Sequence, residues 1–439
     1  MTRVLVYFHE KYMAPSGGPA GYLYNLKRYL EDDGCEKSGA AAGESNGVAD
    51  GAAAGAKNSA AEPEIVFLND KDFHSRFSFL AKKAAQRVFS ADRSLSETGK
   101  RIEQILFNSE QDGRYALDGF DAVHFHSTAD MFAQKKTLEN FKGKVILTSH
   151  TPKAPHREWI EDMESPDVVE RERVLFERTK EFDEYAFSRA DFVIFPCREA
   201  EEPYFHTWAD YPKFRDEKKI LYLPTGCPTC VPKKTRAEIR TELGLSDERF
   251  VISFVGRHNE VKGYDRVIRI FEKLENVTVV CCGKEGAIRS PKSENWIEIG
   301  WTDDPFSYVC ASDLFILPNR ETYFDLALLE TLSFGKTMLL SRTGGNKVFD
   351  GMEDRGIYLF DTEEDAVARI RELMQDGASG ANESTDESAD ESTNDVALSG
   401  GEKTRKEKEA GQVLLHQEKY SMEKFCEGYK EILREILKK

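Results

Sequence analysis

The chain has 439 residues, of which 40% are hydrophobic, and it carries a net charge of −17 at neutral pH. This length and apolar content predict two or three domains with cores of their own. The acidic balance argues against a nucleic-acid partner, because proteins that bind nucleic acids need a basic surface.

Eight cysteines are scattered along the chain, several of them in apolar runs. That distribution is typical of buried free thiols in a reducing compartment rather than of a disulfide framework. No apolar run approaches the roughly 18 residues that a membrane span needs. The first run, Val4–Phe8, is too short and wrongly flanked for a signal peptide. We therefore expect a cytoplasmic protein.

Short apolar runs alternate with segments of helical length along most of the chain. Continuous apolar strands separated by helices predict an α/β protein whose parallel sheets are covered on both faces. Eleven strands are too many for one small doubly wound sheet, so we predict two sheets, one in each half. The predicted strands are Val4–Phe8, Glu64–Leu68, Ala122–Phe125, Val145–Thr148, Phe192–Phe195, Ile220–Leu223, Phe250–Val255, Thr278–Cys282, Trp296–Ile299, Leu314–Leu317 and Thr337–Ser341.

Two segments interrupt this pattern, 36–62 and 377–411, and both are rich in small and polar residues. Neither can bury enough apolar surface to offset its ordering entropy, so both are predicted to be mobile insertions, the second one acidic. The N-terminal domain is predicted at 1–229 and the C-terminal domain at 234–412. Residues 413–439 carry apolar side chains at helical spacing and predict a terminal helix.

The clearest chemical signal follows the run Phe250–Val255. Gly256-Arg257 comes directly after it, Lys262-Gly263 follows five residues later, and a helical pattern then begins. Arginine offers a bidentate fork, lysine a point charge, and a helix N-terminus a partial positive charge. Ligands of open α/β sheets lie beyond the carboxyl ends of strands. The stretch therefore predicts a diphosphate clamp, the alternative being surface charges near a turn.

The segment Pro318–Gly335 follows another predicted strand with the same strand–loop–helix order. Glu330 lies between Leu329 and Leu332, where an unpaired carboxylate would be costly. A structural N–H or arginine partner would satisfy it there. The spacing from Thr322 to Asp325 also fits a helix capping box, in which Thr322 is only a cap.

Together these two segments resemble the nucleotide-sugar half of retaining glycosyltransferases of family 4 (glycosyl transferases group 1), which have the GT-B fold. The resemblance implies two Rossmann-like doubly wound domains that face each other across a cleft, with a C-terminal helix that crosses back to the first domain. It implies a hexosyltransferase for polysaccharide biosynthesis that takes a hexose from a nucleoside diphosphate sugar, with UDP expected. The acceptor is a saccharide, a lipid-linked saccharide or a glycoprotein, and neither a metal ion nor another cofactor is expected.

The resemblance also assigns residues on the donor side. Arg257 and Lys262 bind the diphosphate and stabilise the charge on the leaving group, and Glu330 holds the ribose hydroxyls. The first motif carboxylate departs from the family, because Thr322 stands seven residues before Glu330 with Glu321 beside it. Either Glu321 reaches the sugar, or Asp325, which replaces the usual glycine, holds it with backbone amides. The expected donor-binding residues are Gly17, Gly18, Gly256, Gly283, Thr322, Tyr323, Phe324, Asp325 and Glu330.

Some of these assignments have simpler alternatives. Gly283 follows a predicted strand and lets the backbone approach a nucleotide, but it equally suits a plain turn. The loop with Gly17 and Gly18 follows the first strand, and in the family such a loop closes over the donor phosphates and the acceptor. Alone, a Gly-Gly-Pro sequence is a weak turn signal.

On the acceptor side, the strand 121–127 ends near His126, and the family has a histidine there that faces the reacting sugar. The alternative is a satisfied core histidine, the role expected for His124. His150 lies in a turn that resembles the one beside the family's acceptor cleft. Retaining transfer in the family needs no protein nucleophile, because the leaving phosphate takes the proton of the attacking hydroxyl.

Three other signals carry less weight. Asp70 and Asp72 match a metal-binding pattern of another glycosyltransferase fold but are expected to form a capping turn. Cys227 and Cys230 form half a zinc site without a second ligand pair nearby. The stretch Lys71–Arg101 has a net charge of +5 among aromatic residues. It predicts either peripheral contact with the cytoplasmic membrane face or, as the alternative, a solvated helix face.

The departure at Thr322 also motivates a rival function, a catalytically inactive GT-B subunit that binds a glycan or a partner transferase.

Overall fold

The computed structural model describes residues 2–8, 18–39, 62–68, 94–111, 117–161, 165–382 and 404–439, with the backbone alone for 32–39 and 377–382. The chain forms two compact units. The first contains residues 1–226 and 422–439, and the second contains residues 227–421. The predicted boundary near residues 230–233 lies only a few residues beyond this division.

The first unit contains a six-stranded sheet in which all neighbouring strands are parallel. The strand order is β2-β1-β3-β4-β5-β6, so the direction of winding reverses between β1 and β3. The strands are β1 (Arg3–Tyr7), β2 (Glu64–Phe67), β3 (Ala122–Phe125), β4 (Lys144–Leu147), β5 (Phe192–Phe195) and β6 (Ile220–Tyr222).

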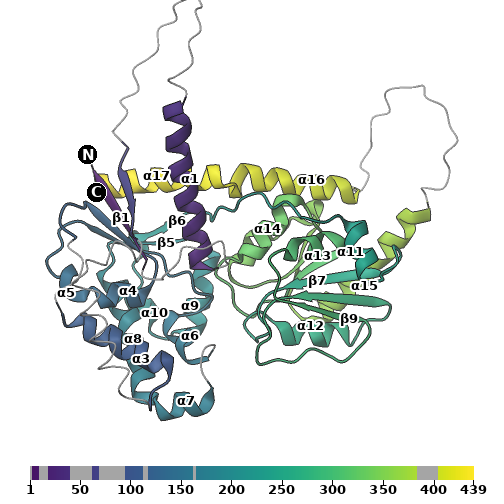
Figure 1. Cartoon of the computed structure of the whole chain (residues 1–439), viewed down its shortest axis with the longest axis horizontal. Helices are drawn as coiled ribbons and strands as arrows, with labels where there is room; N and C mark the ends of the chain where they lie inside the picture. The colour runs from purple at the N-terminus through teal and green to yellow at the C-terminus, as the bar shows by residue number, and fades with distance from the viewer. Residues whose placement is uncertain are drawn as a thin grey trace, which may run out of the picture. The chain divides into compact units, whose positions relative to one another are not determined.

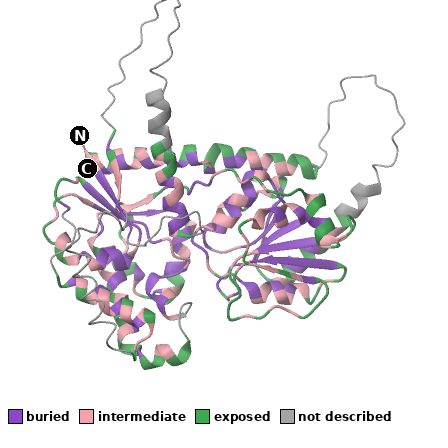
Figure 2. Cartoon of the chain, viewed as in Figure 1, coloured by how far each residue is buried: buried purple, intermediate pink, exposed green. Residues whose placement is uncertain are grey.

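Helices cover this sheet, and its central strands β1, β3, β4 and β5 are mostly buried, whereas the edge strands β2 and β6 are partly exposed (Figure 2). Figure 1 labels most of the helices that the structure describes in this unit. They are α1 (Pro19–Gly39), α3 (Glu97–Ser109), α4 (Thr128–Ala133), α5 (Lys135–Leu138), α6 (Pro155–Glu161), α7 (Pro166–Arg171), α8 (Arg173–Arg189), α9 (Glu202–Thr207), α10 (Tyr211–Phe214) and α17 (Met422–Lys438).

The last helix of the chain, α17, completes the core of the first unit. Its buried residues Phe425, Tyr429 and Leu433 recur every four residues, which places them on one helical face. They pack with Leu23 and Leu26 of α1 against the sheet, and α1 and α17 lie against each other (Figure 1). Fully burying side chains of this size stabilises a fold by roughly 1.5–3 kcal/mol each.

The second unit contains another six-stranded parallel sheet, with the order β12-β11-β10-β7-β8-β9. Here the winding reverses between β7 and β10. The strands are β7 (Phe250–Val255), β8 (Val277–Cys282), β9 (Trp296–Gly300), β10 (Leu314–Leu317), β11 (Met338–Ser341) and β12 (Ile357–Phe360).

Successive side chains of β10 point to opposite faces of this sheet. Leu314 and Ile316 pack with α12 and α15, whereas Phe315 and Leu317 pack with α13, α14 and α16. The helices are α11 (Arg236–Glu242), α12 (Tyr264–Phe271), α13 (Pro305–Ala311), α14 (Leu326–Phe334), α15 (Glu363–Asn382) and α16 (Arg405–Leu415), followed by a π-helical turn (His416–Tyr420).

The sequence-based prediction missed one strand and misplaced the ends of some segments. The missed strand is β12, an edge strand of only four residues that pairs with β11 alone. The insertion predicted at 377–411 is wrong at its ends, because α15 continues to Asn382 and α16 begins at Arg405. Similarly, 36–39 belong to α1. The remaining parts of both insertions, 40–61 and 383–403, lie outside the described residues.

The terminal segment predicted at 413–439 also divides differently. Residues 413–421 belong to the second unit, because Tyr420 packs against Phe349 and its carbonyl accepts a hydrogen bond from the Cys227 N–H at 2.8 Å. Only α17 belongs to the first unit. The periodic pattern predicted a helix there, but where the chain passes from one unit to the other depends on these long-range contacts.

A buried hydrogen bond ties α17 to the first sheet, and its loss should destabilise the first unit. The Tyr429 hydroxyl lies 2.9 Å from Nδ1 of the fully buried His124. Tyr429→Phe leaves this nitrogen unsatisfied, which costs about 1–3 kcal/mol. Chemical denaturation followed by circular dichroism should show the loss, whereas Tyr29→Phe, at a position 38% exposed, should change little. Equal stability of the two variants would contradict this role.

Candidate functional site

The two segments singled out in the sequence meet at one edge of the second sheet. β7 and β10 are neighbours at the reversal of strand order, and parallel strands bring their carboxyl ends to the same edge. Such a reversal opens a crevice in which α/β proteins bind ligands. Gly256 and Arg257 follow β7, and Pro318 and Asn319 follow β10.

A close backbone approach joins the loops after β7 and β10. Gly263 has a φ of +68°, and a Cβ atom at this position would lie 1.9 Å from the Pro318 carbonyl oxygen. No other residue fits there without displacing the backbone. The Arg320 N–H donates a hydrogen bond to the Val261 carbonyl at 3.0 Å. Lys262 is thereby held beside the loop that leads into α14.

Arg257 is exposed at the end of β7. Its guanidinium makes no hydrogen bond or ion pair with any residue that the structure describes. A guanidinium with unused donors beside a strand end can bind a phosphate group with two parallel hydrogen bonds.

Lys262, in contrast, already has an anionic partner. Its ammonium group donates a hydrogen bond to the carboxylate of Asp325, which also accepts one from Asn319 Nδ2 at 3.2 Å. Burial alone would raise the pKa of Asp325, but Lys262 and these hydrogen bonds hold that pKa below its ordinary value. The lysine predicted to bind a diphosphate is therefore neutralised by the residue that replaces the family's glycine.

Asp325 is also the N-cap of α14, and this corrects one prediction. Its side chain accepts a hydrogen bond from the Ala327 N–H at 3.1 Å. The helix begins at Leu326, so Thr322 lies too far upstream to cap it. Thr322 is buried, and its carbonyl accepts a hydrogen bond from the Gly345 N–H at 3.3 Å.

The two aromatic residues expected to bind the donor are largely committed to the protein interior. Tyr323 is only 6% exposed. The Phe324 ring lies 6.2 Å from that of Phe349 and 5.9 Å from that of Tyr420, in the core under α14. Glu321 is half-buried in the same loop. Side-chain contact between these two aromatic residues and a donor stays a prediction.

Glu330 is a half-buried carboxyl group on α14. Burial, and secondarily the Asp325 carboxylate, raises the pKa of Glu330 to about 8. Its side chain makes no hydrogen bond with the described part of the chain. At neutral pH the group is therefore mostly protonated, with a hydroxyl to donate and a carbonyl oxygen to accept, which suits a ribose diol.

The glycine pair at the ends of β7 and β8 has a structural reason of its own. A Cβ atom at Gly283 would lie 1.9 Å from the Gly256 carbonyl oxygen. The two strand ends thus approach too closely for any other residue at 283. This favours the plain-turn alternative for Gly283, and contact with a nucleotide stays a prediction.

In the first unit, the predicted acceptor-side histidines lie together at the end of the sheet. His126 follows β3, is 1% exposed, and its Nδ1 lies 2.8 Å from Nε2 of His150. His124 lies in the core as expected, bonded to Tyr429 and to Thr148. Gly18 is exposed, has a φ of +79° and immediately precedes α1, whereas Gly17 lies outside the described residues.

The sequence-based prediction missed two side chains at this edge of the second sheet. Arg320 forms an ion pair with Asp265, which also binds Arg269 at 2.8 Å. Asn319 binds Asp325. Arg320 comes three residues after the end of β10, which is the same strand-end signal that pointed to Arg257. Its contact with Asp265 could not be read from the sequence.

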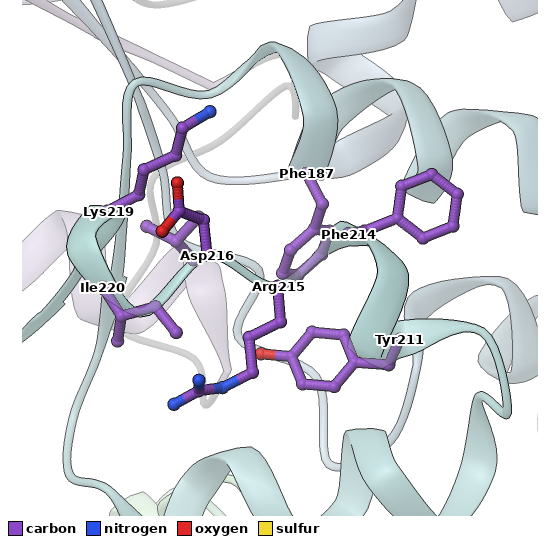
Figure 3. A pocket seen from close by; sticks show the side chains of 8 residues that line it. Phe187, Tyr211, Phe214, Arg215, Asp216, Lys219 and Ile220 are labelled. Carbon is purple, nitrogen blue, oxygen red and sulfur yellow. The ribbon is translucent and has the colours of Figure 1, made fainter.

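A small cavity lies away from both candidate sites. Its lining includes Tyr211, Arg215 and Lys219, and Figure 3 shows these side chains around it. The cavity lies near Ile220, at the amino end of β6, whereas ligands of such sheets bind at carboxyl ends. Its volume of about 10 Å³ suits one water molecule rather than a nucleotide.

The remaining signals add no second site within the described residues. Cys227 and Cys230 are free thiols, and no group of three potential metal ligands is found in the described ranges. Asp70, Asp72 and residues 71–93 of the basic stretch lie outside them. Among the helices described, none has the length and apolar content to cross a membrane.

Comparison with known protein families finds a match within the second unit. Residues 249–376 match the family model of the glycosyl transferases group 1. This range contains every predicted donor residue of the second unit. The prediction of a group 1 glycosyltransferase domain is confirmed over these residues.

Curated relatives agree with this class. The chain is 27% identical over 141 residues to an alpha-galactosylglucosyldiacylglycerol synthase of Streptococcus pneumoniae, which covers 28% of this chain and 38% of the relative. It is 25% identical over 133 residues to the O-antigen biosynthesis glycosyltransferase WclY of Escherichia coli, covering 28% of this chain and 37% of WclY. An uncharacterised 41.2 kDa protein in the cps region of Klebsiella pneumoniae is 22% identical over 319 residues, 64% of this chain and 83% of that protein. The first two alignments thus span well under half of the relatives' length.

Solved structures show the fold of the whole chain. Anabaena HepE, solved in complex with UDP, superposes with a TM-score of 0.57 at 11% identity, over 99% of this chain and all of that one. A glycosyltransferase of Rickettsia africae gives a TM-score of 0.57 at 13% identity, over 100% and 99% of the two chains. With its two six-stranded parallel sheets, the chain has the predicted GT-B architecture of two Rossmann-like domains.

The raised pKa of Glu330 predicts a pH-dependent effect of one substitution. Because the folded-state pKa of about 8 exceeds that of an ordinary glutamate, ionisation destabilises the fold, and stability is lost as the pH rises through 8. Glu330→Gln removes this titration, so its melting temperature should gain on the wild type between pH 6 and pH 9. A gain of a few degrees is expected, because about 1 kcal/mol corresponds to roughly 2–4 °C for a domain of this size.

Scanning calorimetry at several pH values measures the difference. The matched control is Glu353→Gln, at an exposed position of the same unit, which should follow the wild type at every pH. A constant offset between Glu330→Gln and the wild type across this range would show that Glu330 does not titrate near pH 8.

Proposed function

We propose that this protein is a retaining glycosyltransferase that moves a hexose from a nucleoside diphosphate sugar, with UDP as the nucleotide, to a saccharide, lipid-linked or glycoprotein acceptor. The observation that carries the proposal is the exposed, unengaged guanidinium of Arg257 at the reversal point of the second sheet. It lies within the segment that matches the group 1 glycosyltransferases. HepE, which shares the fold, has been solved with UDP-glucose.

The diphosphate binds Arg257 first, because that cation is free of competing contacts in the described chain. Lys262 joins by exchanging its Asp325 carboxylate for a phosphate oxygen. As the bond to the sugar breaks, negative charge grows on the departing phosphate, and the two cations stabilise it. Removing one preorganised group of this kind typically costs about 2.7–4 kcal/mol of transition-state stabilisation.

The other donor residues have separate roles in this proposal. Glu330 binds the ribose hydroxyls, and Glu321 or Asp325 contacts the transferred sugar. His126 faces the reacting sugar from the acceptor side. The departing phosphate takes the proton from the attacking hydroxyl on the same face, so the anomeric configuration is retained without a protein nucleophile. The reaction uses no metal ion, and its rate should persist in EDTA.

Nucleotide binding tests the donor site directly. UDP at a hundredfold excess over its dissociation constant should stabilise the protein by about 2.7 kcal/mol, seen as a rise in melting temperature. GDP and ADP sugars should give smaller shifts. Arg257→Ala should abolish most of the shift, whereas Arg371→Ala, an exposed arginine on α15, should preserve it.

Two results would oppose the proposal at different levels. If no nucleotide shifts the wild type, the donor assignment fails. If UDP binds but no UDP-hexose is consumed with any acceptor, the departure at Thr322 favours the rival function, an inactive subunit that binds a glycan or a partner transferase.

The contact between Lys262 and Asp325 predicts an unusual gain in affinity. Asp325→Asn keeps an equally good N-cap for α14 but removes the charge that neutralises Lys262. UDP should then bind several-fold more tightly, about fivefold for a change of roughly 1 kcal/mol. Isothermal titration calorimetry at constant ionic strength measures the difference. Weaker binding of UDP to Asp325→Asn would mean that Asp325 supports the donor site instead of competing for its lysine.

A further inference from the structure

Two imidazole rings are in direct contact at the carboxyl edge of the first sheet. His126 follows β3, and His150 comes three residues after the end of the neighbouring strand β4. His126 Nδ1 lies 2.8 Å from His150 Nε2, and the rings stack with their planes 20° apart. This edge is next to the reversal of strand order between β1 and β3.

The contact restricts the protons of both rings. A neutral imidazole has one N–H donor and one bare nitrogen acceptor. A hydrogen bond between two ring nitrogens therefore requires a proton on one of them and none on the other. Whichever nitrogen carries the proton, the role of His126 Nδ1 decides the role of His126 Nε2.

Both rings are neutral at physiological pH. Burial lowers the pKa of His150 to about 3, and burial together with His124 and His150 lowers the pKa of His126 well below its ordinary value. The contact is thus between two neutral imidazoles, and an imidazolium pair is excluded.

The second ring nitrogen of His126, Nε2, lacks a hydrogen-bond partner in the described part of the chain. The residue is only 1% exposed. The adjacent His124 does not serve it, because both nitrogens of His124 are bonded elsewhere, to Tyr429 and to Thr148, each at 2.9 Å. A buried polar atom without a partner is costly and therefore indicates a group that binds there.

The backbone of His150 has an uncommon conformation at this contact. Its φ of +61° lies in the left-handed region, which few residues other than glycine adopt. Such conformations cost on the order of 1–3 kcal/mol and persist where the surroundings impose them. The Tyr22 ring of α1 lies edge-on against the imidazole, with 4.6 Å between ring centroids.

We propose that His150 is a positioning residue that fixes the tautomer of His126, so that His126 Nε2 presents a single hydrogen-bonding role to a ligand hydroxyl. The identity of that ligand rests on the proposed function, in which it is a hydroxyl of the reacting sugars. The tautomer itself does not rest on it. In this account His150 acts through His126. It need not contact the acceptor itself, although the sequence predicted a place for it on the acceptor side.

The ¹⁵N spectrum of histidine-labelled protein tests the tautomer directly. Protonated and bare imidazole nitrogens resonate far apart, and rapid exchange between tautomers brings the two signals of a ring together. The signals of His126 are assigned by their absence in His126→Gln. The wild type should show one protonated and one bare nitrogen for His126.

Two substitutions of His150 distinguish the effect of its contact with His126 from the effect of its left-handed backbone conformation. Asparagine tolerates the left-handed conformation but is too short to reach His126, and phenylalanine preserves the ring without a nitrogen. In both variants the two His126 signals should converge. Thr148→Val is the matched control, because it removes a partner of His124 and should leave the His126 signals unchanged. Unchanged His126 signals in His150→Asn, or averaged signals in the wild type, would overturn the proposal.

Kinetics then connect the tautomer to turnover. His150→Asn should lower kcat by about tenfold to a hundredfold, while UDP affinity stays unchanged, because the proposed diphosphate and ribose ligands Arg257, Lys262 and Glu330 belong to the other unit. Loss of UDP binding by the wild type would defeat the proposed function and leave the spectroscopic result standing. A fixed His126 tautomer in His150→Asn would defeat only the inference about His150.

Discussion

The reversal of strand order between β7 and β10 is the constraint on which the proposed donor site depends. Parallel strands bring their carboxyl ends to one edge, and the reversal makes two loops diverge from adjacent strands. Arg257, Lys262 and Asp325 are brought to that edge by this topology, although up to 68 residues separate them in sequence. Gly263 then allows the loops to approach until the Lys262 side chain reaches Asp325.

The charges at this edge are mostly balanced within the protein. Lys262 is paired with Asp325, and Arg320 is paired with Asp265. Glu330, which lacks a hydrogen-bonding partner in the described chain, avoids the cost of a buried charge because its pKa is about 8. Arg257 avoids that cost by exposure. These charges are therefore balanced without a ligand, and under the proposed function phosphate and carboxylate would compete for the same lysine.

The first unit follows the same architecture with a different chemistry at its edge. There the polar groups are neutral imidazoles and hydroxyls, held in the interior by hydrogen bonds to one another. The last helix of the chain contributes Tyr429 to this arrangement and Phe425 and Leu433 to the core. The packing of the first unit is therefore complete only when residues 422–439 are in place, and the 195 residues 227–421 separate them from the first part of the unit.

Much of this organisation could be predicted from local patterns. Apolar runs of strand length mark most of the strands, because buried parallel strands must be apolar on both faces. The one strand that the prediction missed, β12, is also an apolar run of four residues, and it pairs with β11 alone. Glycine and basic residues after β7 indicated an anion site because strand ends and helix starts favour anions wherever they occur.

The partners of individual side chains were decided by the tertiary structure. No local pattern shows that Asp325 caps α14 and neutralises Lys262, or that Thr322 lies in the interior, since these roles depend on how two distant loops meet. The same holds for His126 and His150, 24 residues apart in sequence and joined by the pairing of β3 with β4. The sequence by itself determined which residues are apolar, charged or conformationally free. Long-range packing decided which of them are paired with one another and which remain available to a ligand.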